Sequence, residues 1–342
     1  MKRSFMMKYV LILLFVGSLS FASAQSTDAL YKMARTFMMK GEPDSAITYY
    51  NALLKQDPNN IDALNDYCYL LILEKKYDKA ISLGKELVAK PKANEQSYQT
   101  LGMAYKGNNS FIEADALYKD GLKKFPESGV MYNEFGELFA MQNKLSDAII
   151  QWEAGIKADP NYSNNYYNAT MYYCKVQIDL FWAIQYGEIF LNLESYTAHA
   201  ALIKVKLYDA YKKLFTGDAL DKLAANPNIK EFQKAWFTNI ALASSVTKGG
   251  IDVDILGALR TRFILNWFNA KQNEKTPFHL FEHQQYLLKN GLFDAYNQWL
   301  FGEAANQQYY QMWANTHGRE LNLYQSYQQS KLYKQPSGEY YK

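Results

Sequence analysis

Residues 94–127, NEQSYQTLGMAYKGNNSFIEADALYKDGLKKFPE, decide the fold because their pattern recurs along the first half of the chain. The segment begins with Asn94, a residue type that accepts hydrogen bonds from the free N–H groups of a helix start. Gly102 and Ala114 are small enough to let two helices approach closely. Pro126 ends the second helical stretch because proline lacks the N–H donor that a helix requires. The segment therefore predicts two helices joined by a short break.

The same residue types return at an unbroken interval of 34 residues. Small residues occupy two positions of each unit, aromatic residues a third, and proline a fourth. In the second unit Gly84 replaces the aromatic residue and Lys92 replaces the proline. One helical hairpin cannot bury its own apolar face, so such units must stack on one another. The recurring sets are Ala34, Cys68, Gly102 and Gly136; Ala46, Ala80, Ala114 and Ala148; Tyr50, Gly84, Tyr118 and Trp152; and Pro58, Lys92, Pro126 and Pro160.

Helix boundaries follow the same interval. Serine or asparagine stands where each first helix should begin, and these residue types cap helix N-termini. Glycine, asparagine or lysine stands where the first helix should break before the second. The expected caps are Ser26, Asn60, Asn94 and Ser128, and the expected breaks contain Gly41, Lys75, Asn109 and Asn143.

This pattern resembles the tetratricopeptide repeat family, whose unit is a 34-residue helical hairpin. The third unit has Tyr98, Leu101, Gly102, Tyr105, Ala114, Tyr118 and Pro126 in the family's order, and the fourth has Tyr132, Phe135, Gly136, Phe139, Ala148, Trp152 and Pro160. A fifth unit begins near Ser163, but its Ala183 sits one place late and no proline closes it. The resemblance implies an all-α fold: an α-solenoid of about five helix-turn-helix hairpins over residues 25–192, followed by a C-terminal helical region over residues 193–342.

The C-terminal region keeps helical periodicity but loses the 34-residue phase. Apolar residues recur at helical spacing in Thr197–Phe215, Ile229–Val246 and Val253–Lys271, with glycine or proline between these segments. In the last of them we expect Arg260 and Arg262 to lie off the core face. The sequence therefore predicts further packed helices in this half of the chain.

A degenerate repeat-like hairpin is predicted near residues 276–302. If Ala295 is the small residue of its second helix, Tyr286 and Trp299 take the aromatic positions. His279, Glu282 and His283 then fall on the inward face of the first helix, and the two histidines are hydrogen-bonded spacers between helices.

The segment His279-Leu280-Phe281-Glu282-His283 also spells H-x-x-E-H, and in this it resembles the inverted zinc peptidases. In that family the two histidines hold zinc and the glutamate acts as general base. The sequence offers neither the strands nor the distant acidic third ligand of those enzymes. We therefore predict no metal, no cofactor and no catalytic residue, and we keep a zinc-dependent hydrolase as an alternative.

The first 24 residues have the pattern of a signal peptide. Lys2, Arg3 and Lys8 accompany an apolar run over residues 9–21, and the small residues of Ala22-Ser23-Ala24 form a cleavage site. The apolar run is short for a bilayer span. The sequence therefore predicts an exported protein without an integral membrane span after cleavage, located in the periplasm, at the outer membrane or outside the cell.

The charge balance excludes a nucleic-acid partner. The chain has 37 basic and 34 acidic residues, and three of the basic ones lie in the predicted signal peptide. Nucleic-acid binding requires a basic face that neutralises phosphates. A nearly neutral mature chain does not predict such a face.

The resemblance implies that the first helices of the repeats line a concave face that binds a protein or peptide segment of the cell envelope. Tyrosine, methionine and amide side chains on this face are adaptable contacts. We therefore predict a non-enzymatic interaction scaffold or adaptor. A glycan- or nutrient-binding envelope component is the alternative, because the Tyr-rich composition is similar to that of secreted repeat proteins of Bacteroidetes. The predicted partner-binding residues are Tyr31, Arg35, Met38, Asn65, Tyr69, Gln99, Met103, Asn133, Glu137, Tyr167 and Met171.

Overall fold

The computed structural model describes residues 26–176 and 179–341, so the predicted signal peptide, residues 1–24, lies outside the described residues. Every regular element in the described part of the chain is a helix, which confirms the predicted all-α class. None of these helices is long and apolar enough to cross a bilayer. The chain divides into two compact units, which we call unit 1, ending at Asn108, and unit 2, beginning at Asn109.

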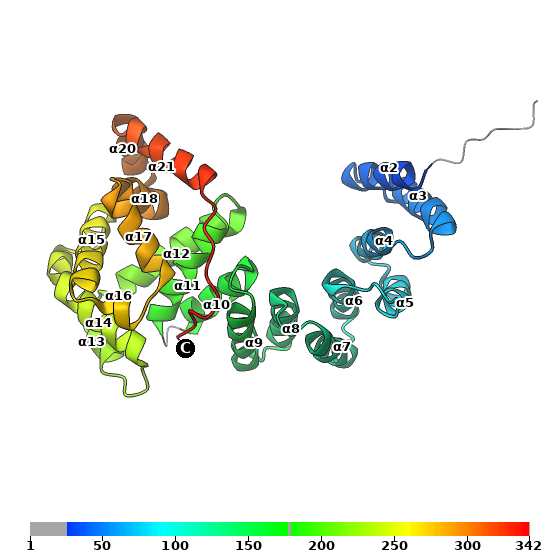
Figure 1. Cartoon of the computed structure of the whole chain (residues 1–342), viewed down its shortest axis with the longest axis horizontal. Helices are drawn as coiled ribbons and strands as arrows, with labels where there is room; N and C mark the ends of the chain where they lie inside the picture. Colours follow the sequence, from blue (N-terminus) through cyan, green and yellow to red (C-terminus); the bar gives the residue numbers. More distant parts are fainter. Residues whose placement is uncertain (1–25, 177–178, 342) are drawn as a thin grey trace, which may run out of the picture. The chain divides into compact units, whose positions relative to one another are not determined.

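Unit 1 contains the first two repeat hairpins and the first helix of the third (Figure 1). The predicted caps are confirmed, because the side chains of Ser26, Asn60 and Asn94 each accept a hydrogen bond from a backbone N–H three residues later. Each cap satisfies one of the free donors of a helix start. The helices are α2 (Thr27–Met39), α3 (Pro43–Gln56), α4 (Ile61–Leu73), α5 (Tyr77–Val88) and α6 (Glu95–Gly107).

Unit 2 begins with the remaining repeat helices. Ser128 caps the fourth repeat by accepting a hydrogen bond from the Met131 N–H. The recurring small and aromatic residues are buried, as Ala148 and Trp152 show. The stacked repeat pairs therefore follow the predicted register. The helices are α7 (Phe111–Lys124), α8 (Gly129–Met141), α9 (Leu145–Ala158), α10 (Ser163–Val176) and α11 (Leu180–Leu193).

All four predicted breaks adopt a left-handed backbone conformation. The φ angles are 72° at Gly41, 56° at Lys75, 58° at Asn109 and 60° at Asn143. Glycine and asparagine adopt this conformation more readily than other residues, whereas lysine does so at a steric cost. The turn between the two helices of a repeat is thus the same in four hairpins, although the residue types differ.

The helices after the repeats match the three predicted segments. Helices α12, α14 and α15 occupy them, and Gly217 and Gly250 have the positive φ angles of the predicted breaks. Short helices fill the intervals. In order these elements are α12 (Ala198–Leu214), α13 (Ala219–Ala224), α14 (Glu231–Ala243), the 3₁₀ helix η1 (Ser244–Gly249), α15 (Val253–Asn269) and α16 (Gln272–Lys275).

The degenerate hairpin is only partly as predicted. Ala295 and Trp299 are buried, and Tyr286, which was given an aromatic position of the repeat, is 40% exposed. Glu282 is exposed, so its predicted inward position is wrong. The inward face of the first helix is instead set by Phe281, which packs against the rings of the core. The elements here are α17 (His279–Lys289), α18 (Phe293–Asn297), the π-helix η2 (Gln298–Gly302), α19 (Glu303–Ala305), α20 (Gln307–Thr316) and α21 (Gly318–Ser330).

Helix α11 lies at the centre of unit 2. All its residues from Leu180 to Leu191 are buried, which is unlike the one-sided burial of the other repeat helices. One hydrophobic cluster extends from Ala148 to Tyr324 and contains residues of α11 and of the C-terminal helices. The fifth hairpin and the C-terminal region therefore share a single core.

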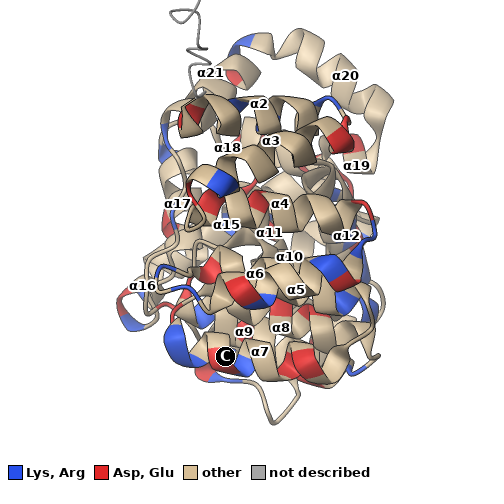
Figure 2. Ribbon diagram, turned by 90° about the vertical axis from the view of Figure 1, so that its right-hand side faces the viewer, with Lys and Arg blue, Asp and Glu red and all other residues tan. Residues whose placement is uncertain are grey.

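Residues 331–341 form an extended segment that runs back along unit 2 (Figure 1, red). Asn161 holds it by two hydrogen bonds with the backbone of Gln335, each 3.0 Å long. The Glu339 carboxylate accepts a hydrogen bond from the His279 N–H at the start of α17. Tyr341 stacks on Phe232 with 4.6 Å between ring centroids. This segment thus joins the start of the fifth repeat to the C-terminal helices. Figure 2 shows that acidic and basic residues are interspersed along the helices.

Candidate functional site

Two of the predicted partner-binding residues in unit 1 are held by a residue that the sequence did not single out. The Asp66 carboxylate accepts a hydrogen bond of 2.9 Å from the Tyr31 hydroxyl and one of 3.4 Å from the Tyr50 hydroxyl. Arg35 lies 3.7 Å from the same carboxylate oxygen. Burial and the bond to Asp66 raise the pKa of Tyr31 to about 12. Tyr31 and Arg35 on α2 are therefore both linked to Asp66 on α4.

The other predicted residues of unit 1 differ in accessibility. Tyr69 is 38% exposed, whereas Asn65 on the same helix is 1% exposed. Neither amide atom of Asn65 has a hydrogen-bond partner, which is costly for a buried polar group. Gln99 and Met103 on α6 are partly buried. Tyr69 is thus more exposed than Asn65, Gln99 and Met103.

In unit 2 two of the predicted residues, Asn133 and Glu137, form a polar row with Asn168 across two first helices. Asn168 donates a 2.9 Å hydrogen bond to the Oδ1 of Asn133, whose Nδ2 donates a 3.1 Å bond to Glu137. Tyr167 stacks on His199, with ring centroids 4.5 Å apart. The polar row therefore joins α8 to α10, and the stack of Tyr167 on His199 joins α10 to the start of α12. The sequence did not indicate Asn168 or His199, because Asn168 lies one place beyond the 34-residue register of Asn133.

A groove of about 390 Å³ adjoins this row. Met171, the last predicted residue, lines it together with Trp152 and Tyr172, and Lys175 and Lys206 supply positive charge. Burial raises the pKa of the neighbouring Cys174 thiol to about 11, so this thiol stays protonated and unreactive at neutral pH. The groove offers apolar contact, amides and two ammonium groups, which suit a polypeptide segment.

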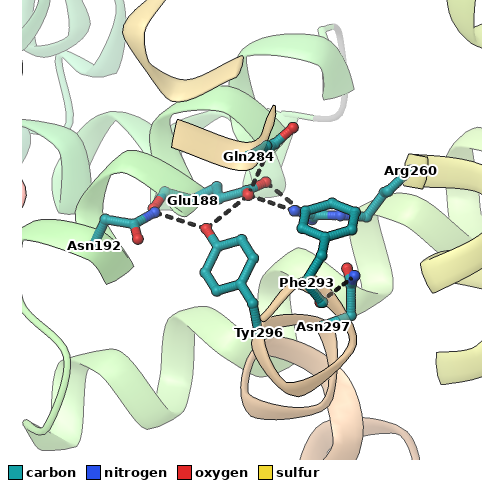
Figure 3. Close-up of polar contacts among 7 residues, drawn as sticks. All are labelled: Glu188, Asn192, Arg260, Gln284, Phe293, Tyr296 and Asn297. Carbon is teal, nitrogen blue, oxygen red and sulfur yellow. Dashed lines mark hydrogen bonds and ion pairs between the residues drawn. The ribbon is translucent and has the colours of Figure 1, made fainter. Parts of the chain in front are cut away.

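A buried ionic cluster lies deeper in unit 2, where α11, α15, α17 and α18 meet (Figure 3). Arg260 binds the Glu188 carboxylate through both terminal nitrogens, at 3.0 and 2.5 Å. Gln284 and the Tyr296 hydroxyl donate further bonds to Glu188 at 2.6 and 2.8 Å, and Asn192 donates to Tyr296 at 2.7 Å. The Glu188 carboxylate thus meets partners from three other helices, whereas the buried Nε of Arg260 has no hydrogen-bond partner.

The position of Arg260 corrects the sequence analysis, which placed it off the core face. Arg260 is 2% exposed and Glu188 is 1% exposed. The guanidinium carbon of Arg260 lies 5.1 Å from the ring centroid of Phe301 and 5.6 Å from that of Tyr296. Because the carboxylate and the rings together satisfy the cation, α15 turns this arginine inward. The cluster orients four helices and has no lining residue in common with the groove.

The histidines of the H-x-x-E-H segment point to separate environments. His279 Nδ1 lies 3.5 Å from Glu282, near the surface. His283 Nδ1 lies 3.3 Å from the Tyr327 hydroxyl, and its ring contacts Tyr296 and Tyr333. Within residues 26–176 and 179–341, no group of three or more His, Cys, Asp or Glu side chains is placed to hold a metal ion. This geometry favours a packing role for the segment over zinc chemistry.

His283 should make stability depend on pH. Burial, with His279 and Lys331 nearby, lowers the pKa of His283 to about 4 from 6.5. Between these values the unfolded chain binds more protons than the folded chain, so the free energy of unfolding falls as the pH decreases. His283→Gln is expected to reduce this slope by up to about 1.4 kcal/mol per pH unit. Urea denaturation over this pH range measures the slope, with His317→Gln as the exposed control. Equal slopes in wild type and His283→Gln would contradict the assignment.

Comparison with known proteins identifies tetratricopeptide repeats in part of the chain. Two tetratricopeptide repeat profiles match residues 37–102 and 100–163. No curated protein sequence matches significantly. Solved structures that resemble the chain include a thermophilic TPR protein of Thermus thermophilus, with 17% identity, a TM-score of 0.44 and coverage of 54% of this chain and 99% of that one. PilF of Pseudomonas aeruginosa has 16% identity and a TM-score of 0.45, and the match covers 61% of this chain and 95% of PilF. MamA of Desulfovibrio magneticus has 12% identity and a TM-score of 0.39, and the match covers 49% of this chain and 94% of MamA.

Proposed function

We propose, from the premise that residues 37–163 belong to the tetratricopeptide repeat family, that this protein is a non-enzymatic scaffold of the cell envelope. Repeats of this family are helical hairpins whose stacked faces bind protein segments. The partner is an extended polypeptide segment, and it binds to the outward face of the first helices. We call this surface the first-helix face; in unit 2 it comprises Glu137, Tyr167, Asn168 and Met171, with the buried Asn133 beneath them.

The polar row beside the groove is the observation that supports this proposal. Asn133 is 1% exposed and both of its amide atoms are bonded, so it orients Asn168, whose amide oxygen can accept a hydrogen bond from the backbone of an extended chain. The groove at Met171 and Tyr172 is large enough for an apolar side chain of the partner. Lys175 and Lys206 favour an acidic residue next to that side chain.

Site-specific photo-cross-linking tests which face binds the partner. A photo-reactive phenylalanine analogue replaces Tyr69 or Met171 on first helices, and Ile112 or Ile150 on second helices as controls. Ile112 and Ile150 are 85% and 59% exposed, so the controls present the probe at least as freely. We expect the first-helix positions to cross-link to one polypeptide of envelope extracts, and Tyr69→Ala to weaken capture of that polypeptide. Equal cross-linking from both kinds of helix would reject the first-helix face.

Export is the second part of the proposal, and it rests on the sequence of residues 1–24. A basic start, an apolar run and the triplet Ala22-Ser23-Ala24 are the features of a cleaved signal peptide. We expect the mature protein to begin at Gln25. N-terminal sequencing of protein purified from the cell envelope measures this directly, and an intact Met1 would refute cleavage. A variant with Ala24→Leu should be processed more slowly, because cleavage requires small residues.

A further inference from the structure

A cavity of about 620 Å³ lies in the C-terminal part of unit 2, away from the first-helix face. Its walls come from α15, from α18 and the π-helix η2, and from α20 and α21. Gly257, Ala258, Gly291 and Ala295 line it with little or no side chain, which leaves room for a bound molecule. A π-helical turn such as η2 often accompanies a functional site.

The charge of the cavity is mainly negative. Asp254, Asp294 and Glu320 line it, against the single cation Arg262. Asp254 already accepts a 2.6 Å hydrogen bond from the Tyr309 hydroxyl, and Arg262 donates to Ser245. Within the described part of the chain, Asp294 and Glu320 have no ion-pair partner. Two carboxylates are therefore available to a ligand.

Two buried amides in the same wall also lack partners for their oxygen atoms. Asn297 is 2% exposed and its Nδ2 donates to the Phe293 carbonyl (Figure 3), while its Oδ1 has no hydrogen-bond partner. Gln298 is 4% exposed and its Oε1 also has none, but this oxygen lies beside Gly302, outside the cavity lining. Buried polar atoms are normally paired, so unpaired acceptors in a cavity wall indicate a missing donor.

An aromatic pair completes the lining. The Trp313 and His317 rings stack with centroids 4.8 Å apart and an angle of 2° between their planes. A tryptophan face attracts cations through its quadrupole. The cavity thus combines carboxylates, the unpaired carbonyl oxygen of Asn297 and an indole ring, all of which favour a positively charged donor.

We propose that this cavity binds an organic cation that carries N–H donors, namely a primary ammonium or a guanidinium group. The carboxylates of Asp294 and Glu320 would pair with the charge, and the Asn297 carbonyl oxygen would accept an N–H. The cation comes either from a free polyamine or from an arginine side chain of a polypeptide. This site is independent of the first-helix face and of export.

Isothermal titration calorimetry of the full mature chain tests the proposal with defined probes. Spermidine represents the free amine, and an N-acetylated, C-amidated tripeptide Gly-Arg-Gly represents the side chain. The same tripeptide with citrulline in place of arginine keeps the shape and removes the charge. We expect saturable binding of at least one cation, weaker binding as salt increases, and no binding of the citrulline peptide. The stronger of the two cationic probes identifies the source.

Substitutions of residues that line the cavity test whether the cation binds there. Asp294→Asn and Glu320→Gln each keep the size of the side chain, and each is expected to weaken binding roughly twofold to fivefold, as the loss of one exposed charge pair does. Trp313→Leu should also weaken it. Asp221→Asn on α13, an exposed carboxylate outside the cavity, is the matched control and should leave affinity unchanged. Equal binding of the citrulline peptide, equal loss in Asp221→Asn, or no saturable binding of either cation in the millimolar range would overturn the proposal.

Discussion

Arg260→Met is expected to destabilise the protein by about 3–5 kcal/mol, because it leaves the Glu188 carboxylate buried without its cation. Both side chains of the pair are nearly inaccessible to water, so no solvent replaces the lost partner. Gln284 and Tyr296 still donate to Glu188, but neutral donors do not compensate a buried charge. The free energy of unfolding from urea denaturation measures the effect.

Arg262→Met is the matched control, since it makes the same chemical change two residues along the same helix. Arg262 is exposed and donates to Ser245, so its replacement should change stability by less than about 0.5 kcal/mol. The double variant Glu188→Met with Arg260→Met should recover much of the loss, because the uncompensated charge disappears with its partner. Similar costs for Arg260→Met and Arg262→Met would show that the buried pair has been misplaced.

The sequence predicted the repeats because their determinants are local. Caps such as Asn94 and turn residues such as Asn143 act within a few positions, and the interval of 34 residues places them. Ser26, Asn60 and Asn94 were therefore recovered as caps, and the four left-handed turns were found at the predicted breaks. Helical periodicity likewise predicted α12, α14 and α15, although it could not show which other helices pack against them.

The contacts that position the functional surfaces could not be predicted, because they join distant segments. Glu188 meets Arg260, Gln284 and Tyr296 across 72 to 108 positions of the chain. An arginine on an apolar helix has no local sign that separates a buried pair from an exposed position. Asp66 was missed for a similar reason, since the register identifies a face but not which side chains on it bind each other.

The same limit explains the errors at α17. The register of Ala295 predicted an inward Glu282, but the face of a helix is set by all the rings that it meets. Phe281 lies 5.0 Å from the ring centroids of both Phe263 and Trp267, and this packing rotates Glu282 towards solvent. A sequence match to the H-x-x-E-H motif on this helix therefore does not show that its side chains lie together in one site.

Gly136→Ala is expected to destabilise the protein by about 1–3 kcal/mol through overpacking of the crossing between α8 and α9. A β-carbon at Gly136 would lie 2.3 Å from the Nε1 and 2.5 Å from the Cδ1 of Trp152. The indole ring is rigid and only 5% exposed, so it cannot yield without moving the helix. The free energy of unfolding from urea denaturation measures the change.

Gly257→Ala provides the control, because it makes the same substitution in a helix where the nearest atom to a β-carbon is 4.0 Å away. Alanine forms helix more readily than glycine, so this variant should gain up to about 1 kcal/mol. The same Gly→Ala substitution is therefore expected to lower the free energy of unfolding at Gly136 and to raise it at Gly257. Trp152→Leu introduced with Gly136→Ala should restore part of the loss, because the smaller side chain makes room for the new methyl group. If Gly136→Ala stabilised the protein as Gly257→Ala does, the repeat register that brings Gly136 against Trp152 would be wrong.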